Sequence, residues 1–121
     1  MDRAIYLALA KMCGDNLAYC LPSAVRPLAE QMPDVSCAIY VASDRRGIVC
    51  YVGSVCRPND PCGLASHIGE YLLDVSKTAK WHELQLLPLR DGTPEPDVRS
   101  LAGEVAGWLL PYDNQRWPTA G

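Results

Sequence analysis

The sequence predicts a small α/β (α+β) domain in which a three-stranded mixed sheet is flanked by helices. Two adjacent β-rich runs are separated by a short turn, and two later segments carry apolar residues at helical spacing. The chain has 121 residues, of which 49% are hydrophobic and 21% are charged, so we expect one folded core. We divide the chain into an N-terminal helical extension, residues 1–36, and a domain, residues 37–121.

The extension begins with a segment that has the pattern of an amphipathic helix. Within residues 2–20, the apolar side chains of Ile5, Leu9, Met12 and Cys13 share one helical face. Ser23 is in a position to cap a second short helix that would end before Pro33. We expect residues 1–36 either to pack across the sheet or to make a dimer contact. We also expect removal of residues 1–20 to destabilise the domain.

The first part of the domain reads as a β-hairpin followed by a helix. Residues 37–43 and 48–54 are rich in β-forming residues and are joined by a turn that ends in Gly47. A loop with two prolines follows, and a helix is predicted from Gly63. The apolar face of this helix repeats with helical period and contains Leu64, Ile68, Tyr71, Leu72 and Val75.

A third strand and a final helix complete the predicted domain. Residues 81–89 are apolar enough for a strand, and Thr93 followed by Pro94 and Glu95 is typical of a helix start. This helix should extend to about Leu110, before Pro111. Its buried stripe is expected to contain Val98, Leu101, Ala102, Val105 and Leu109.

The charge of the chain and the length of its apolar segments indicate which binding partners and which cellular compartment to expect. The net charge of −3 and the pI near 5.2 argue against tight DNA binding by the whole surface, because such binding depends on Lys and Arg. A local basic stripe remains open, formed by Arg45, Arg46, Arg57, Lys77 and Lys80. The apolar run 4–10 is too short to span a membrane and is a poor signal peptide. We expect a cytoplasmic protein with no membrane partner, whose six cysteines are reduced.

Two tripeptides on the predicted hairpin resemble the signature of a known superfamily. Ala38-Ile-Tyr40 and Tyr51-Val-Gly53 are similar to the two halves of the GIY-YIG nuclease motif. A Gly-Leu-x-x-x-Ile helix start at residue 63 and a Pro-Tyr-Asp-Asn sequence ending at Asn114 follow in family order. The resemblance is to compact single-domain members, and it leaves residues 1–36 uncovered.

The resemblance implies a site, two positions of which are altered. In this superfamily a tyrosine helps to activate water, a helix arginine stabilises the phosphate, and a glutamate binds one divalent metal. Here His67 stands at the arginine position and Ala102 at the glutamate position, while Glu104 would face the other side of the helix. We assign catalytic positions to Tyr40, Tyr51, His67 and Tyr71. We assign ligand-binding positions to Gly53, Arg57, Cys62 and Asn114, and no metal site.

Three functions remain open at this point. The favoured one is a pseudoenzyme that has lost phosphodiester hydrolysis and binds a small-molecule ligand or a protein partner. The second is a metal-independent enzyme that acts on a small molecule through His67, Tyr51 or Cys62. The third is a DNA endonuclease that depends on Mg²⁺ or Mn²⁺. A zinc site or nucleophilic pair built from Cys56, Cys62 and His67 is a weaker alternative, because the spacing matches no strong metal motif.

Overall fold

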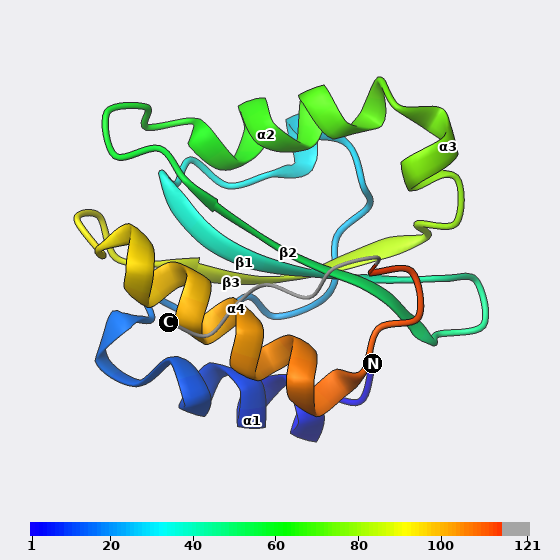
Figure 1. Ribbon diagram of the computed structural model, residues 1–121, viewed down its shortest axis with the longest axis horizontal. Coiled ribbons are helices and arrows are strands. Elements are labelled where there is room, and N and C mark those ends of the chain that lie inside the picture. The colour runs from blue at the N-terminus through cyan, green and yellow to red at the C-terminus, as the bar shows by residue number, and fades with distance from the viewer. Residues whose placement is uncertain (115–121) are drawn as a thin grey trace.

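A three-stranded sheet separates two layers of helices in the computed structural model, which describes residues 1–114 (Figure 1). The strands are β1 (Cys37–Ser43), β2 (Val49–Cys56) and β3 (Glu83–Leu89). One face is covered by α2 (Gly63–Leu72), which continues into the short α3 (Val75–Thr78). The other face is covered by α1 (Arg3–Cys13) and α4 (Glu95–Leu109). The predicted fold class is confirmed. The last residues of the predicted domain, 115–121, lie outside the described residues.

The strand directions differ from the expected mixed sheet. The order is β2-β1-β3, and both pairings are antiparallel. Strands β2 and β3 do run in the same direction, but the connection through α2 carries the chain past β1 to the far edge of the sheet. Because β1 lies between them, no two neighbouring strands are parallel.

The hairpin forms as predicted, and the Asp44 side chain fixes its turn. Gly47 has a φ of 79°, in the left-handed region that favours glycine. The Asp44 carboxylate accepts hydrogen bonds from the backbone N–H groups of Arg46 (2.9 Å) and Ile48 (3.1 Å). Strand β2 ends at Cys56, two residues later than predicted.

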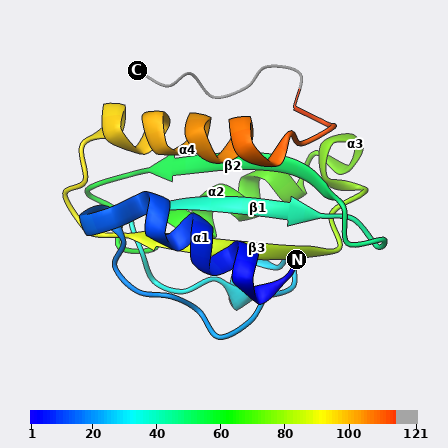
Figure 2. The same cartoon turned by 90° about the horizontal axis from the view of Figure 1, so that it is seen from below.

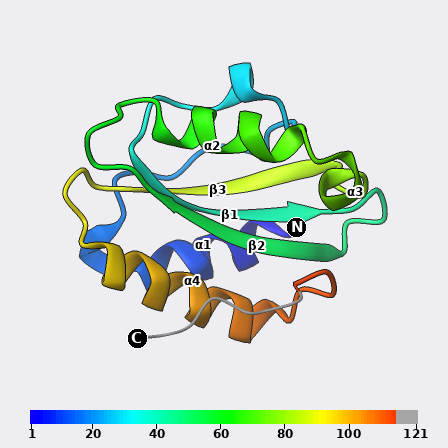
Figure 3. The same ribbon diagram turned by 45° about the horizontal axis from the view of Figure 1, so that its top comes forward.

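The sheet buries both of its faces. Along β1, Ile39 and Val41 point toward α1 and α4, whereas Ala38, Tyr40 and Ala42 point toward α2. All seven residues of β1 are buried, which explains why this central strand reads as a continuous apolar run. Figure 3 shows the two helical layers on opposite sides of the sheet.

Helix α4 places the predicted stripe against the sheet. Val98, Ala102 and Val105 are buried, and Leu101 and Leu109 are partly buried against the same core. The helix starts at Glu95, at the predicted Thr93-Pro94-Glu95 sequence. Pro94 occupies the cap position, and the Thr93 hydroxyl donates to the Arg90 carbonyl at 2.6 Å. Figure 2 shows α4 along β2, with α1 beside it.

Helix α1 belongs to the same core as α4. Tyr6, Leu9, Ala10 and Cys13 are buried, whereas Ile5 is 38% exposed, so the buried face is rotated from the predicted one. The helix ends at Cys13 and does not extend toward residue 20. The Tyr6 hydroxyl donates to the Leu86 carbonyl of β3 at 2.6 Å, which ties α1 to the sheet.

The second helix expected after Ser23 does not form, because this segment follows the edge of β3 instead. Val25 and Leu84 exchange two backbone hydrogen bonds of 2.9 and 2.8 Å, and Leu17 forms a bridge with Leu89. A helix here would leave the edge of β3 without these partners. The only regular turn in this stretch is a single 3₁₀ turn at Ala29–Gln31.

The N-terminal segment then reaches the opposite face of the sheet. Met32 and Val35 are buried in the core beneath α2, and the Val35 carbonyl accepts a hydrogen bond from the Leu64 N–H at 3.0 Å. Residues 1–36 therefore contribute to both cores. Within residues 1–114, every helix is too short or too polar to cross a membrane.

Candidate functional site

The four predicted catalytic side chains meet on the α2 face of the sheet. The Tyr40 hydroxyl lies 3.0 Å from His67 Nε2, and the rings of His67 and Tyr71 are 4.5 Å apart between centroids. The Tyr51 ring lies 6.0 Å from that of Tyr40 and 5.5 Å from that of Trp81. We call these five residues the aromatic cluster. Trp81 was not predicted to belong to it.

Three local features of the sequence assemble the aromatic cluster. Tyr40 pairs with Gly53 across the β1–β2 ladder, and a Cβ at residue 53 would overlap the ring and the hydroxyl of Tyr40. Tyr51 is two residues before Gly53, so both lie on the same face of β2. His67 and Tyr71 are four residues apart on α2 and therefore share one side of that helix. Gly53 thus makes room for a ring.

The two hairpin tyrosines are protonated at neutral pH. Burial raises the pKa of Tyr40 well above its usual value, and the neighbouring phenol of Tyr51 adds to this effect. Burial also raises the pKa of Tyr51, with a further contribution from Tyr71. A phenol with a raised pKa donates a hydrogen bond readily but is a poor proton acceptor.

The positive charge expected beside these tyrosines is weak. Burial lowers the pKa of His67, and the charge of Arg57 lowers it further, so the imidazole is neutral at pH 7. Arg57 itself is held by Glu70 through two hydrogen bonds of 2.7 and 3.0 Å. A neutral imidazole and a paired guanidinium offer little stabilisation to a developing phosphate charge.

A cleft of about 540 Å³ opens beside Tyr51. It is lined by Tyr51, Asp74, Ser76, Lys77, Lys80, Asp113 and Asn114. The Lys77 ammonium lies 4.7 Å from the Tyr71 ring centroid, and the Lys80 ammonium lies 3.4 Å from the Asp113 carboxylate. Of the eight predicted site residues, only Tyr51 and Asn114 line this cleft, and His67 is not among its lining residues.

Basic residues continue past the cleft. A second cleft of about 400 Å³ also contains Lys80 and is lined in addition by Arg45, Arg46 and Tyr112. Arg46 forms an ion pair with Asp44 at 3.3 Å. Four of the five residues of the expected basic stripe therefore lie around two adjoining clefts, and Arg57 is the exception.

Asn114 has a structural role at the cleft. Its side-chain amide accepts from the Val52 N–H and donates to the Val52 carbonyl, both at 3.0 Å. The Asp113 N–H donates to the Cys50 carbonyl at 2.8 Å. Residues 113 and 114 thus cover the free edge of β2, and the Asn114 amide is engaged by the backbone and not presented to a ligand.

The carboxylates near the aromatic cluster are engaged by protein groups. Asp74 caps α3 and accepts from the Ser76 hydroxyl at 2.8 Å, which lowers its pKa. Glu70 and Asp113 are paired with Arg57 and Lys80. In the described part of the chain, no three metal-binding side chains converge. This donor set does not fit Mg²⁺ or Mn²⁺, which prefer several free oxygen ligands.

The position assigned to the metal-binding glutamate lies on the other side of the sheet. Ala102 is fully buried in the core between α4, α1 and the sheet, whereas the aromatic cluster lies under α2. Glu104 is exposed on α4 and does not approach the tyrosines' layer. A carboxylate at residue 102 would be buried among apolar side chains.

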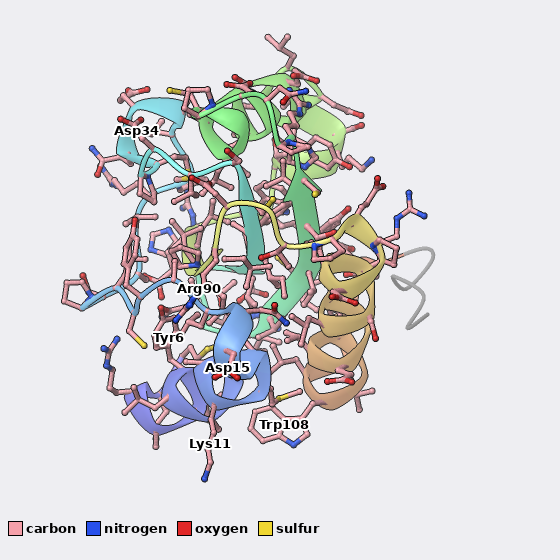
Figure 4. The ribbon with its side chains drawn as sticks, turned by 90° about the vertical axis from the view of Figure 1, so that its left-hand side faces the viewer. Tyr6, Lys11, Asp15, Asp34, Arg90 and Trp108 are labelled. Atoms are coloured by element: carbon pink, nitrogen blue, oxygen red, sulfur yellow. The ribbon has the colours of Figure 1, made fainter. Side chains whose placement is uncertain are left out.

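Cys62 lies apart from the aromatic cluster and the cleft. Its exposed thiol is 3.5 Å from the Asp34 carboxylate, on the side of the molecule where Figure 4 labels Asp34. The hydrogen bond to Asp34 raises the pKa of this thiol. Cys56 points to the opposite face of the sheet, so Cys56, Cys62 and His67 do not form a zinc site or a nucleophilic pair.

Comparisons with models of protein families, with curated proteins and with solved structures found no match. The resemblance to the GIY-YIG superfamily therefore rests on the motif residues. Sequence reasoning named Lys77 only as part of a basic stripe and missed the places of Ser76 and Asp113 at the cleft. The available signal was the Asp74-x-Ser76-Lys77 pattern of a capped turn, which predicts α3 but not the neighbouring cleft.

Proposed function

We propose that this protein contains a GIY-YIG-like domain that no longer hydrolyses phosphodiesters and binds a small organic anion in the cleft beside Tyr51. The observation that carries the proposal is the pairing of a protonated phenol with a lysine-bearing rim in one cleft. Tyr51 donates to the ligand, and Lys77 and Lys80 supply the complementary charge.

The charge of the rim supports an anionic ligand. Within residues 1–114, Lys77 forms no ion pair, and its ammonium rests on the ring of Tyr71 at the cleft. Lys80 contacts Asp113, but the Lys80 side chain is 59% exposed, so an incoming anion can also contact the Lys80 ammonium. The volume of about 540 Å³ lies in the range of clefts that hold metabolite-sized ligands.

The same geometry argues against hydrolysis. Attack on a phosphodiester needs a deprotonated nucleophile and positive charge beside the phosphate. Tyr40 and Tyr51 are poor bases because burial raises their pKa, and His67 is neutral. The nearby carboxylates already have protein partners. We therefore propose binding without cleavage: Lys77 and Lys80 supply positive charge at the cleft, whereas the phenols are poor bases and the carboxylates already have protein partners.

Calorimetric titration tests the binding proposal. Adenosine 5′-monophosphate is the probe, and adenosine is the uncharged control. We expect the monophosphate to bind and adenosine to bind at least about tenfold more weakly, since one charge-assisted contact contributes roughly 1.5–3 kcal/mol. Lys77→Gln should weaken binding of the monophosphate by about tenfold. Lys11→Gln, on the outer side of α1 in Figure 4, should not change it. Equal affinities of the two lysine variants would refute the proposal.

A cleavage assay tests the loss of hydrolysis. Plasmid and branched DNA should remain intact in the presence of the native chain with either Mg²⁺ or Mn²⁺. Cleavage by the native chain that disappears in Tyr51→Phe would make a nuclease the correct assignment.

A further inference from the structure

Two cysteines face each other at the open end of the β1–β2 hairpin. Cys37 and Cys56 are register partners in the antiparallel ladder, and their sulfur atoms are 3.4 Å apart. The Arg57 N–H donates to the Ser36 carbonyl at 3.1 Å, so the pair formed by residues 36 and 57 is the hydrogen-bonded one. The next pair inward, Cys37 and Cys56, is therefore a non-hydrogen-bonded pair.

This position suits a covalent link. In a non-hydrogen-bonded pair the Cα atoms are about 4.5 Å apart and the side chains approach closely. That separation lies inside the range of about 4.4–6.8 Å that disulfides span. Small rotations of the two side chains suffice to bring the sulfur atoms to bonding distance.

We propose that Cys37 and Cys56 are a redox modification site, where a two-electron oxidant such as a hydroperoxide forms a reversible cross-strand disulfide. Neither residue has a part in the anion-binding cleft, so this inference does not depend on the proposed function. The other four cysteines are not arranged in this way. Cys20 and Cys62 are exposed, Cys50 lies on the α2 face of the sheet, and Cys13 lies on α1.

The reaction begins at Cys56, because Cys37 is fully buried and Cys56 is only partly buried. The Cys56 sulfur attacks hydrogen peroxide, the O–O bond breaks, and a sulfenic acid and one water form. The Cys37 sulfur then attacks the Cys56 sulfur, the S–O bond breaks, and a second water leaves with the Cys37 proton. Each sulfur loses one electron, and the two electrons reduce the peroxide. A dithiol reverses the link by thiol–disulfide exchange.

The link would close the hairpin that carries Tyr40 and Tyr51. Residues 37–56, which are β1, the turn and β2, would become a loop closed by the disulfide. Such a loop restricts the unfolded chain and raises the melting temperature, by roughly 10 °C for a domain of this size.

The test uses the full chain with Cys20→Ser and Cys62→Ser, which removes the two exposed thiols. After treatment with hydrogen peroxide, the protein is denatured, alkylated and mapped by peptide mass spectrometry. We expect the loss of two free thiols and a peptide pair that joins Cys37 to Cys56. Melting temperature should rise on oxidation and return with dithiothreitol. The same parent with Cys56→Ser should show neither change.

Two results would overturn the inference. One is a Cys56 that carries oxygen while Cys37 remains free. The other is a link from either residue to Cys13, which belongs to the same core. A melting curve of each reduced variant shows whether it is folded before oxidation, so that misfolding is not mistaken for a missing link.

Discussion

Gly53 lies directly across the β1–β2 ladder from Tyr40, and the Tyr40 ring occupies the space that a side chain at residue 53 would need. This relationship lets Tyr40 lie over β2 and reach His67 on α2 at 3.0 Å. The glycine of the second motif half therefore determines where the first tyrosine points.

Gly53→Ala should destabilise the protein by roughly 1–3 kcal/mol, because the added methyl group overpacks a buried site. Urea unfolding measures this change. The control is Gly107→Ala on α4, where an added Cβ meets no atom within 4 Å. That substitution should be neutral or stabilising by up to about 1 kcal/mol, since alanine favours a helix over glycine. Similar losses in the two variants would contradict the role of Gly53.

Asn114→Asp should cost roughly 1–3 kcal/mol of unfolding free energy. The substitution removes the N–H group that donates to the Val52 carbonyl and places a carboxylate beside that oxygen. Asn59→Asp makes the same chemical change in an exposed loop and should have little effect. If the Asn114 variant unfolds at the same urea concentration as the native chain, the edge contact is not stabilising.

The N-terminal segment should be required for stability. Leu9→Ala should cost roughly 2–5 kcal/mol because Leu9, on the inner face of α1, is fully buried in the core. Leu7→Ala, on the same helix but 49% exposed, should change stability by less than about 0.5 kcal/mol. Deletion of residues 1–20 should lower the melting temperature further, and an unchanged melting curve after the deletion would contradict the account.

His67 should make stability depend on pH. Its pKa is lower in the folded than in the unfolded protein, mainly through burial, so the unfolded state binds the proton more tightly. This contribution is present above the unfolded pKa of about 6.5 and is lost as pH falls toward the folded value. His67→Gln should therefore flatten the rise of unfolding free energy with pH below about pH 6.5. The control is His82→Gln, at the exposed second histidine, which should leave the rise of unfolding free energy with pH unchanged. An NMR titration of His67 should give a pKa below its usual value.

The hairpin and the meeting of its tyrosines were predictable because both depend on local spacing. The strand register makes Tyr40 and Gly53 neighbours across the hairpin. The spacing of four residues places His67 and Tyr71 on the same side of one helix. The cleft was harder to predict, since Lys77 and Asn114 are distant in sequence and meet only after the sheet forms. Local patterns carry little information about such contacts.

The incorrect predictions share a physical cause. Ser23 has the sequence of a helix cap, but the unpaired edge of β3 offers hydrogen bonds that a local helix cannot replace. The mixed sheet was expected without knowledge of which edge β3 would occupy. Ala102 was assigned to the glutamate position by the resemblance, and a motif resemblance does not reveal which face of the sheet α4 covers.

The most direct test of the central claim is to map by NMR where adenosine 5′-monophosphate binds on the ¹⁵N-labelled chain. We predict saturable amide shifts that are largest at Tyr51, Ser76 and Lys77 and that adenosine does not reproduce. Saturable shifts confined to another surface, or no shifts at all, would contradict an anion-binding cleft beside Tyr51.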